Sequence, residues 1–410
     1  MSDAPMRILH LRVVRGTGGG PDKTTLRGCQ WLRKAGHVAE AFYMLDAREN
    51  TGRLEDLAGQ LAVPMHRAME TSPLSLGTVA HLRRVLQQGR FDILHTHDYK
   101  SNALAQLTRA WHRGRVVATA HGYNQTTRRE TYYYALERAC FRHVRAIICP
   151  TRGMRDFLRS WGLPESRLVV IPNGIETAGR ERPVHVPTES VPWTLAHGAS
   201  NRSALKLLYL GRLSAEKDVA NLLEAASILR QQGVAFELTV AGDGPEAGPL
   251  REQAKHLGLE SAVRFLGFVT DVNSVLASAD VLVNPSRTEC MPNSVLEAMW
   301  AGVPVVATDV GGLSEIIRHG EHGLLCPPRD HKALAAQVAR LARDGDLAKQ
   351  LAKSAMARVD AEFTFERRMQ RVVGLYRQVM KNPDLRTDCD EPSRAATSGR
   401  SSVTAPMPIR

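Results

Sequence analysis

The sequence predicts an α/β protein with two doubly wound parallel sheets, one in each of two domains that face each other across a cleft. Short apolar strands alternate with helical segments in residues 6–172, and the alternation begins again at residue 205. This alternation is typical of parallel sheets covered by helices on both faces. The stretch between the two series is rich in proline without a helical period, and 410 residues suffice for two domains.

In the first series each strand is a short apolar run. The strands are expected at residues 6–14, 37–45, 91–97, 116–121, 146–150 and 168–172, and the helices at 25–35, 75–88 and 128–141. A glycine-rich loop, 16–24, joins the first strand to the first helix. Ligands of such sheets bind beyond the carboxyl ends of the strands, so the loops that follow strands are candidate binding elements.

In the second series strands and helices alternate more regularly, and an amphipathic helix follows. The strands are expected at residues 205–210, 235–241, 263–266, 281–285, 303–308 and 323–326, and the helices at 220–231, 248–257, 272–278, 293–301, 330–341 and 363–380. We therefore expect a first domain at 1–178, a linker at 179–203, a second domain at 204–362, a C-terminal helix at 363–381 and a polar, disordered tail at 382–410.

Composition excludes several classes of protein. Hydrophobic residues make up 43% and charged residues 23% of the chain, which excludes collagen-like, coiled-coil and wholly disordered proteins. No apolar run approaches the ~20 residues of a membrane-spanning helix, and the short apolar stretch 8–14 lacks a cleavage site. The six cysteines are scattered and form no CxxC pair, so we expect reduced, buried thiols in a cytoplasmic protein.

Net positive charge is concentrated in the first half of the chain. The net charge is +12, and residues 1–176 hold 26 Lys and Arg against 15 Asp and Glu. A basic half indicates an anionic partner such as an acidic lipid, a phosphorylated substrate or a nucleic acid, although a generic basic surface explains the same excess. We hypothesise that an anionic membrane surface is such a partner.

The most informative stretch is 284–304, where a strand ends, a loop carries Glu289, and a helix begins with Pro292 near its first position. Glu297 follows about one turn into the helix. Free N–H groups at a helix start suit a phosphate. The two carboxylates can then bracket a nucleotide sugar, one accepting from sugar hydroxyls and the other from ribose hydroxyls. A solvated helix face would also explain the spacing between Glu289 and Glu297. The interpretation as a binding site therefore depends on the strand, loop and proline around them.

A second constellation follows the expected strand at 205–210. Arg212 and Lys217 stand in the loop after Gly211. A guanidinium fork and a lysine charge at a strand tip suit a diphosphate. In a transferase they would stabilise the negative charge that builds on the leaving group. The alternative is two exposed basic residues without a function.

These residues give the chain a resemblance to family 4 of the retaining nucleotide-sugar glycosyltransferases, which have the GT-B architecture. The resemblance covers residues 6–380. The motifs that carry it, in the order of the family, are 18–24, 118–122, 170–175, 211–217, 241–245, 289–297 and 305–312. The run 291–299 is similar to the exopolysaccharide and lipopolysaccharide branches of the family. The resemblance implies that the helix at 363–380 crosses back onto the first domain.

The resemblance implies roles for the matching residues of the second domain. Arg212 and Lys217 would hold the donor diphosphate. Glu289 would bind hydroxyls of the transferred sugar, and Glu297 would bind the ribose. The donor-binding candidates are Gly18, Gly19, Gly20, Gly211, Arg212, Lys217, Cys290, Met291, Pro292, Asn293 and Glu297. Cys290 stands where the family more often has glycine, and its side chain could narrow the sugar pocket.

The resemblance also implies roles for the first domain. His121 would lie near the sugar, and Gly18, Gly19 and Gly20 would let the backbone approach the donor phosphates or the acceptor. The catalytic candidates are His121, Arg212, Lys217 and Glu289. The implied reaction uses no metal and retains the anomeric configuration, and the departing phosphate oxygen draws the acceptor proton.

The expected function follows from this resemblance. A hexose-type sugar would pass from a nucleoside-diphosphate sugar to a saccharide or lipid-linked acceptor in the synthesis of cell-surface polysaccharide. No cofactor and no nucleic-acid partner are expected. The protein would be cytoplasmic, and its basic first domain raises the hypothesis of peripheral association with the inner face of the membrane.

Other interpretations stay open at this point. A sugar-nucleotide epimerase of the same architecture would lack an acceptor, and a non-catalytic sugar- or nucleic-acid-binding protein would use the basic half. His95, His97 and Asp98 could suggest a metal site at the end of a strand, but no further ligand clusters with them in the sequence. The glycines in 242–247 imitate a dinucleotide fingerprint, and the loop 16–24 imitates a phosphate-binding loop that lacks its required glycine.

Overall fold

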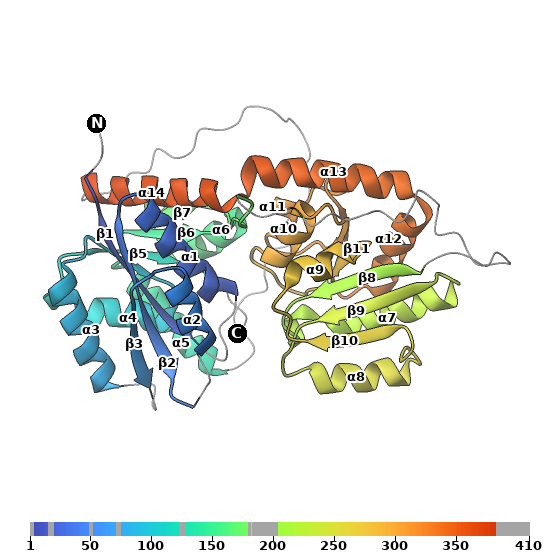
Figure 1. Ribbon diagram of the computed structural model, residues 1–410, viewed down its shortest axis with the longest axis horizontal. Coiled ribbons are helices and arrows are strands. Elements are labelled where there is room, and N and C mark those ends of the chain that lie inside the picture. The colour runs from blue at the N-terminus through green and yellow to red at the C-terminus, as the bar shows by residue number, and fades with distance from the viewer. Residues whose placement is uncertain are drawn as a thin grey trace.

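The computed structural model describes residues 4–14, 20–48, 52–70, 75–122, 128–178, 182 and 204–382. It has two α/β domains side by side, each with a parallel sheet covered by helices (Figure 1). The two doubly wound sheets predicted from the sequence are therefore confirmed. The predicted linker, apart from Arg182, and the predicted tail beyond Asn382 lie outside the described residues.

The first domain is built on a seven-stranded sheet in the order β3-β2-β1-β4-β5-β6-β7, with parallel pairing throughout. Its strands are β1 (Arg7–Val14), β2 (Val38–Asp46), β3 (Met65–Glu70), β4 (Ile93–Thr96), β5 (Arg115–Thr119), β6 (Ala146–Cys149) and β7 (Leu168–Val170). Its helices are α1 (Gly20–Lys34), α2 (Gly52–Gln60), α3 (Leu76–Gly89), α4 (Tyr99–Leu107), α5 (Arg128–Phe141) and α6 (Arg152–Ser160), with short 3-10 helices η1 (Arg109–Trp111) and η2 (Glu165–Arg167).

The second domain is built on a six-stranded parallel sheet in the order β10-β9-β8-β11-β12-β13. Its strands are β8 (Leu205–Leu210), β9 (Phe236–Ala241), β10 (Val263–Gly267), β11 (Val281–Asn284), β12 (Val305–Thr308) and β13 (Leu324–Cys326). Its helices are α7 (Val219–Gln231), α8 (Ala247–His256), α9 (Val272–Ala277), α10 (Asn293–Trp300), α11 (Leu313–Ile316), α12 (His331–Arg343) and α13 (Gly345–Glu362), with the 3-10 helix η3 (Ala215–Lys217).

In both sheets the order of the strands reverses between two central neighbours. The reversal lies between β1 and β4 in the first domain, and between β8 and β11 in the second. A reversal of this kind opens a crevice at the carboxyl ends of the two strands, and ligands of open α/β sheets bind there. The loops that the sequence analysis singled out follow β1, β8 and β11.

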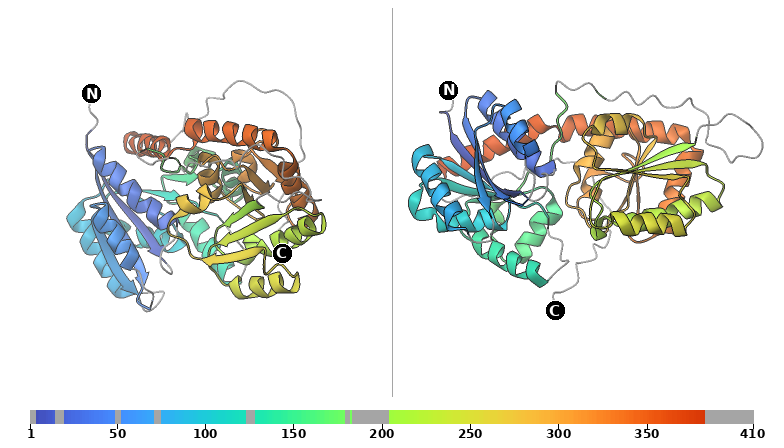
Figure 2. Two further views of the ribbon diagram at one scale, coloured as in Figure 1. Left: turned by 45° about the vertical axis from the view of Figure 1, so that its right-hand side comes forward. Right: turned by 60° about the horizontal axis from the view of Figure 1, so that its bottom comes forward.

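The last helix, α14 (Phe365–Lys381), packs on the first domain although it follows the second in the sequence. Its apolar side shares one core with the first sheet, in which Met369, Val372 and Tyr376 of α14 lie among residues such as Ile8 and Ile93. The side chain of Thr364 caps the helix by accepting from the N–H of Arg367 at 3.3 Å. Helices α13 and α14 therefore run one after the other along one side of the two domains (Figure 2).

The first predicted helix starts much earlier in the structure than expected, whereas the helix after Glu289 starts at the expected residue. The first helix begins at Gly20, five residues earlier than expected, so this glycine belongs to α1 and not to the loop before it. Helix α10 begins at Asn293, and Pro292 is the extended residue before it. The fixed φ of proline fits both positions, since residues before a helix and at its first turn share φ near −65°.

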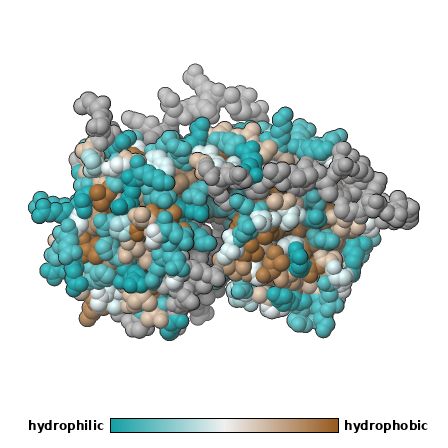
Figure 3. All heavy atoms as spheres, in the orientation of Figure 1, coloured by the Kyte–Doolittle hydropathy of each residue, from teal (hydrophilic) through white to brown (hydrophobic). Residues whose placement is uncertain are grey.

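The surface differs between the two domains. On the face shown in Figure 3, hydrophilic side chains cover most of the first domain, whereas apolar side chains are more frequent over the second. Within the described residues, no helix has the length and apolar character needed to cross a bilayer.

Candidate active site

The loops after β8 and β11 bring Lys217 and Glu289 into direct contact. The ammonium Nζ of Lys217 lies 2.6 Å from Oε1 of Glu289, and the hydroxyl of Ser286 donates to the same oxygen at 2.9 Å. The Glu289 side chain is only 7% exposed, whereas that of Lys217 is 23% exposed. Lys217 is therefore the more accessible member of a held pair, and a phosphate entering from the cleft can compete for it.

Arg212 stands in the same loop as Lys217. It follows Gly211 at the end of β8 and is exposed. Its carbonyl accepts from the hydroxyl of Tyr209 at 2.8 Å, which fixes the backbone. No hydrogen bond or ion pair joins its guanidinium to another described residue. The structure thus places two of the expected cationic groups at one strand end, with one of them uncommitted.

The segment between Glu289 and α10 contacts the first domain. Met291 is buried, and its carbonyl accepts from the amide of Asn173 at 3.0 Å. Cys290 is half-buried, and burial raises the pKa of its thiol to about 12, so it remains a thiol at neutral pH. Glu297, the fifth residue of α10, is partly exposed.

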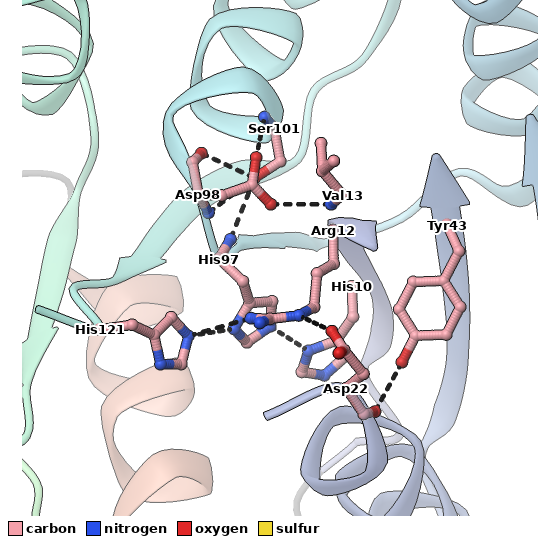
Figure 4. A network of polar contacts seen from close by, with 9 residues as sticks. All are labelled: His10, Arg12, Val13, Asp22, Tyr43, His97, Asp98, Ser101 and His121. Carbon is pink, nitrogen blue, oxygen red and sulfur yellow. Dashed lines mark hydrogen bonds and ion pairs between the residues drawn. The ribbon is translucent and has the colours of Figure 1, made fainter. Parts of the chain in front are cut away.

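On the first domain, three histidines form a row that ends at His121 (Figure 4). Nδ1 of His10 lies 3.0 Å from Nε2 of His97, and Nδ1 of His97 lies 3.3 Å from Nε2 of His121. The neighbouring rings are stacked in both steps. His121 is exposed at the end of the row, and Nη1 of Arg12 lies 3.4 Å from its Nε2.

A fourth histidine lies beside the row and is fully engaged. His95 is buried, with Nδ1 at 2.6 Å from the hydroxyl of Tyr376 on α14 and Nε2 at 2.7 Å from the hydroxyl of Thr119. Burial lowers the pKa of His10 to about 3, and burial also holds the pKa values of His95 and His97 well below their usual value. These three rings are therefore neutral at physiological pH.

Two family models match the chain. Residues 18–178 match the model described as Glycosyltransferase Family 4, and residues 204–344 match the model described as Glycosyl transferases group 1. The chain belongs to glycosyltransferase family 4. The family identified by resemblance in the sequence is thereby confirmed, and with it a glycosyltransferase enzyme.

Individual relatives agree with this family. The chain is 29% identical over 331 residues to the putative glycosyltransferase EpsD of Bacillus subtilis, covering 78% of this chain and 85% of EpsD. It is 29% identical over 262 residues to the putative colanic acid biosynthesis glycosyltransferase WcaL of Salmonella typhimurium, covering 61% of each protein. Among solved structures, that of Anabaena HepE in complex with UDP-glucose has a TM-score of 0.75 at 21% identity, covering 90% of this chain and 99% of HepE. The fold is therefore GT-B.

Some residues expected at the site of this glycosyltransferase are not placed there by the described part of the chain. Gly18 and Gly19 lie outside the described residues, and Gly20 begins α1. Asp98 is not a ligand candidate beside the histidines. It caps α4, where its carboxylate accepts from the N–H groups of Ser101 at 2.9 Å and Val13 at 2.8 Å.

His10 is the residue that sequence analysis missed. Its ring lies with those of His95 and His97, and one nitrogen of each falls within 4.8 Å of the others. The only signal was that His10 lies on the first strand, and its neighbour became known only when the structure paired it with His95 of β4. The two positions are far apart in the sequence, so spacing could not reveal the cluster.

The two domains of the glycosyltransferase also touch directly. The carboxylate of Glu315 on α11 accepts from the backbone N–H groups of Arg152 at 2.8 Å and Gly153 at 2.9 Å. These groups lie in the first turn of α6, where N–H groups have no partner within the helix. A side chain of the second domain therefore caps a helix of the first.

Proposed function

We propose that this glycosyltransferase moves a sugar from a nucleoside-diphosphate sugar to a saccharide or lipid-linked acceptor in polysaccharide synthesis. The observation that carries the proposal is the contact between Lys217 and Glu289 beside the uncommitted guanidinium of Arg212. A diphosphate needs cations, and a sugar needs a fixed carboxylate acceptor; these groups stand at the carboxyl ends of the neighbouring strands β8 and β11. The named roles of EpsD and WcaL, and the UDP-glucose in HepE, support this choice of substrates.

In this proposal the donor separates Lys217 from Glu289. Its diphosphate binds Arg212 and draws Lys217 away from Glu289, which leaves the carboxylate of Glu289 to accept from hydroxyls of the sugar. The ribose reaches Glu297 on α10. The two side-chain cations offset the negative charge that grows on the departing diphosphate, so the reaction proceeds without a metal ion.

We also propose retention of configuration by front-face substitution. The bond between the anomeric carbon and the diphosphate oxygen breaks, and the bond to the acceptor oxygen forms on the same face. The acceptor proton passes to the departing phosphate oxygen. In this proposal Glu289 accepts from hydroxyls of the sugar, so it is not the covalent nucleophile that a double displacement would need.

The acceptor would bind on the basic first domain, which carries most of the net positive charge of the chain. We propose that an anionic membrane surface brings the acceptor there. Binding of the full chain to anionic vesicles at low salt, with release at high salt, is the expected result. Equal binding to neutral vesicles would contradict this part of the proposal.

A thermal-shift panel with UDP, GDP and ADP in the presence of EDTA tests the donor site. One diphosphate should stabilise the protein by about 2.7 kcal/mol when present at 100 times its dissociation constant. Arg212→Ala should abolish the shift. The control Lys255→Ala removes an exposed cation on α8 and should keep it.

The same variants are then assayed for transfer. Lys217→Ala should lower kcat by about 10²- to 10³-fold, because it removes a group that stabilises the leaving group. Proton NMR of the product should show the anomeric configuration of the donor. No shift with any diphosphate would overturn the donor assignment, an inverted product would overturn retention, and epimerised donor without transfer would identify an epimerase.

A further inference from the structure

A small cavity lies under the row of histidines, between helix α1, strands β1 and β4, and helix α14. Its volume is about 50 Å³. A single water needs ~10–15 Å³ of such space, so the cavity can hold a few waters or one compact polyatomic group. His10, His97 and Arg368 line it, and exposed His121 marks the side that reaches the cleft.

One wall of the cavity carries a positive charge without a counter-ion. Arg368 of α14 is 9% exposed, and Nη1 of its guanidinium donates to Oδ1 of Asn173 at 2.5 Å. No ion pair joins it to a described residue. Burial lowers the pKa of Arg368 to about 10, so the group is still protonated at neutral pH. Buried charges are normally paired, and this one has no pair within the described part of the chain.

A second polar group on the same cavity is also unsatisfied. Nε2 of His10 is buried and has no hydrogen-bond partner among the described residues, while Nδ1 of the same ring is engaged by His97. His10 is 4% exposed, so bulk water does not reach it. Buried polar atoms are almost always hydrogen-bonded. A ligand that carries negative charge and accepting oxygens would satisfy Arg368 and His10 together.

A metal cation fits this cavity less well than an anion. The nitrogens of His10, His95 and His97 come within 4.8 Å of one another, which is close enough to share an ion. However, both nitrogens of His95 already bind hydroxyl groups. The described lining contains no carboxylate, and the charge of Arg368 would repel a divalent cation.

We propose that the cavity is a binding subsite for one compact oxyanion, a carboxylate or phosphate group, held by the guanidinium of Arg368 and the Nε2–H of His10. The group is either a free ion or the charged substituent of an acceptor. Binding of the anion does not depend on the proposed function, whereas its assignment to an acceptor rests on it.

Binding of an anion in the subsite changes the tautomer of His121 through the row of histidines. When Nε2–H of His10 donates to the anion, Nδ1 of His10 accepts from His97, and Nδ1 of His97 accepts from Nε2–H of His121. Nδ1 of His121 is then an acceptor. Without the anion, Nη1 of Arg12 donates to Nε2 of His121, the tautomers reverse along the row, and Nδ1–H of His121 is a donor.

The first test is titration of the full chain with sodium acetate and with sodium phosphate at constant ionic strength, followed by thermal shift. Both are done in the Arg212→Ala protein, so that phosphate cannot report the donor site. A saturable rise in Tm is expected. Arg368→Gln should lower the affinity for the anion at least tenfold. The control Arg367→Gln, which changes an exposed neighbour on α14, should leave that affinity unchanged.

A second readout uses the wild-type protein and does not depend on how Arg368→Gln folds. The ring nitrogens of ¹⁵N-labelled histidines report their tautomers by NMR. Acetate should move His10 and His121 towards the Nε2–H form in parallel with the thermal shift. Unchanged histidine signals at saturating acetate and phosphate, together with no rise in Tm, would overturn the proposal.

Sugar acids separate the two sources of the anion. Glucuronate or glucose 6-phosphate that binds more tightly than acetate or phosphate, with no effect of glucose, assigns the anion to an acceptor; equal affinities assign a free ion. Zinc that stabilises the protein where no anion does would overturn the proposal. In the Arg368→Gln protein with Arg212 intact, the thermal shift caused by the nucleoside diphosphate should persist. Failure of the anion subsite and failure of the donor site are therefore distinguishable.

Discussion

At the scale of single residues, burial decides the charge state of the first-domain side of the site. His10, His95 and His97 are kept neutral because they are desolvated, and Arg368 adds positive charge nearby. A neutral ring can donate at one nitrogen and accept at the other. The hydrogen bonds along the row can therefore reverse their direction without any change in the net charge of the rings.

The first prediction concerns pH. The pKa of His10 is lowered to about 3 in the folded protein, whereas an unfolded histidine titrates near 6.5. Between these values the unfolded chain binds more protons, so the stability that His10 contributes is present above pH 6.5 and is lost as pH falls. The slope approaches about 1.4 kcal/mol per pH unit for this residue. His95 and His97 shift in the same direction.

Urea denaturation at pH 7.5, 6.5 and 5.5 measures this slope. His10→Gln should reduce the loss of unfolding free energy between pH 6.5 and 5.5, because it removes one titrating group. His256→Gln, an exposed histidine on α8, should leave the loss as in the wild type. A loss of equal size in the wild type and in His10→Gln would contradict the prediction.

Residues that follow a strand can be predicted from the sequence, whereas contacts between residues of neighbouring strands cannot. Arg212, Lys217 and Glu289 were predicted because each stands just after an apolar run. The contact between Lys217 and Glu289 could not be predicted, since it depends on β8 lying next to β11. His10 was missed for the same reason.

At the scale of elements, apolar runs predicted the central strands well and the peripheral elements poorly. Strand β3 (Met65–Glu70) went unassigned because it lies at the edge of its sheet and carries polar side chains. Helix α13 (Gly345–Glu362) went unassigned because its buried side is formed largely by alanines, which give a weak periodic signal. Packing against neighbours, not local pattern, holds both elements.

The second prediction concerns the turn between β12 and α11. Gly311 has φ of +52°, and a β-carbon there would lie 1.8 Å from the carbonyl oxygen of Glu289. Gly311→Ala should therefore push the Glu289 loop away, at a cost of about 1–3 kcal/mol in stability. Displacement of Glu289 by about 1 Å should lower kcat by about 10²-fold.

Thermal unfolding and a transfer assay of the same protein measure the two effects. Gly248→Ala is the matched control, because Gly248 lies in helix α8 and a β-carbon at this position would have nothing within 4 Å. That change should be neutral or stabilise the helix by up to about 1 kcal/mol. Wild-type activity and stability in Gly311→Ala would show that the loop does not depend on this close approach.

At the scale of the whole molecule, the two domains are linked by groups that also hold the site in place. Glu315 of the second domain caps α6 of the first, and Asn173 of the first binds the carbonyl of Met291 near the start of α10. Both contacts lie close to the segment that carries Glu289. We therefore expect closure of the domains and alignment of the site to be coupled.

The third prediction concerns this coupling. Glu315→Ala leaves two N–H groups of α6 without their acceptor and should cost about 1 kcal/mol at the contact. The open arrangement of the domains should become more populated, with a larger radius of gyration by small-angle X-ray scattering and a raised KM for the donor. The domains themselves should keep their folds.

The comparison protein is Glu321→Ala, which removes an exposed carboxylate from the same domain and leaves the α6 contact intact. It should scatter like the wild type. A compact Glu315→Ala protein with an unchanged KM would show that other contacts hold the domains together.

The placement of α14 has a consequence for the order in which the chain can mature during synthesis. The first sheet is complete once Val170 has left the ribosome, but the helix that covers one of its faces begins only at Phe365. Until then the apolar face around Ile8 and Ile93 is covered only in part, by helices α1 and α2, and the exposed remainder is a surface that chaperones recognise. The second domain, which is synthesised later, can therefore finish folding first. Helix α14, which is synthesised after it, completes the core of the first domain.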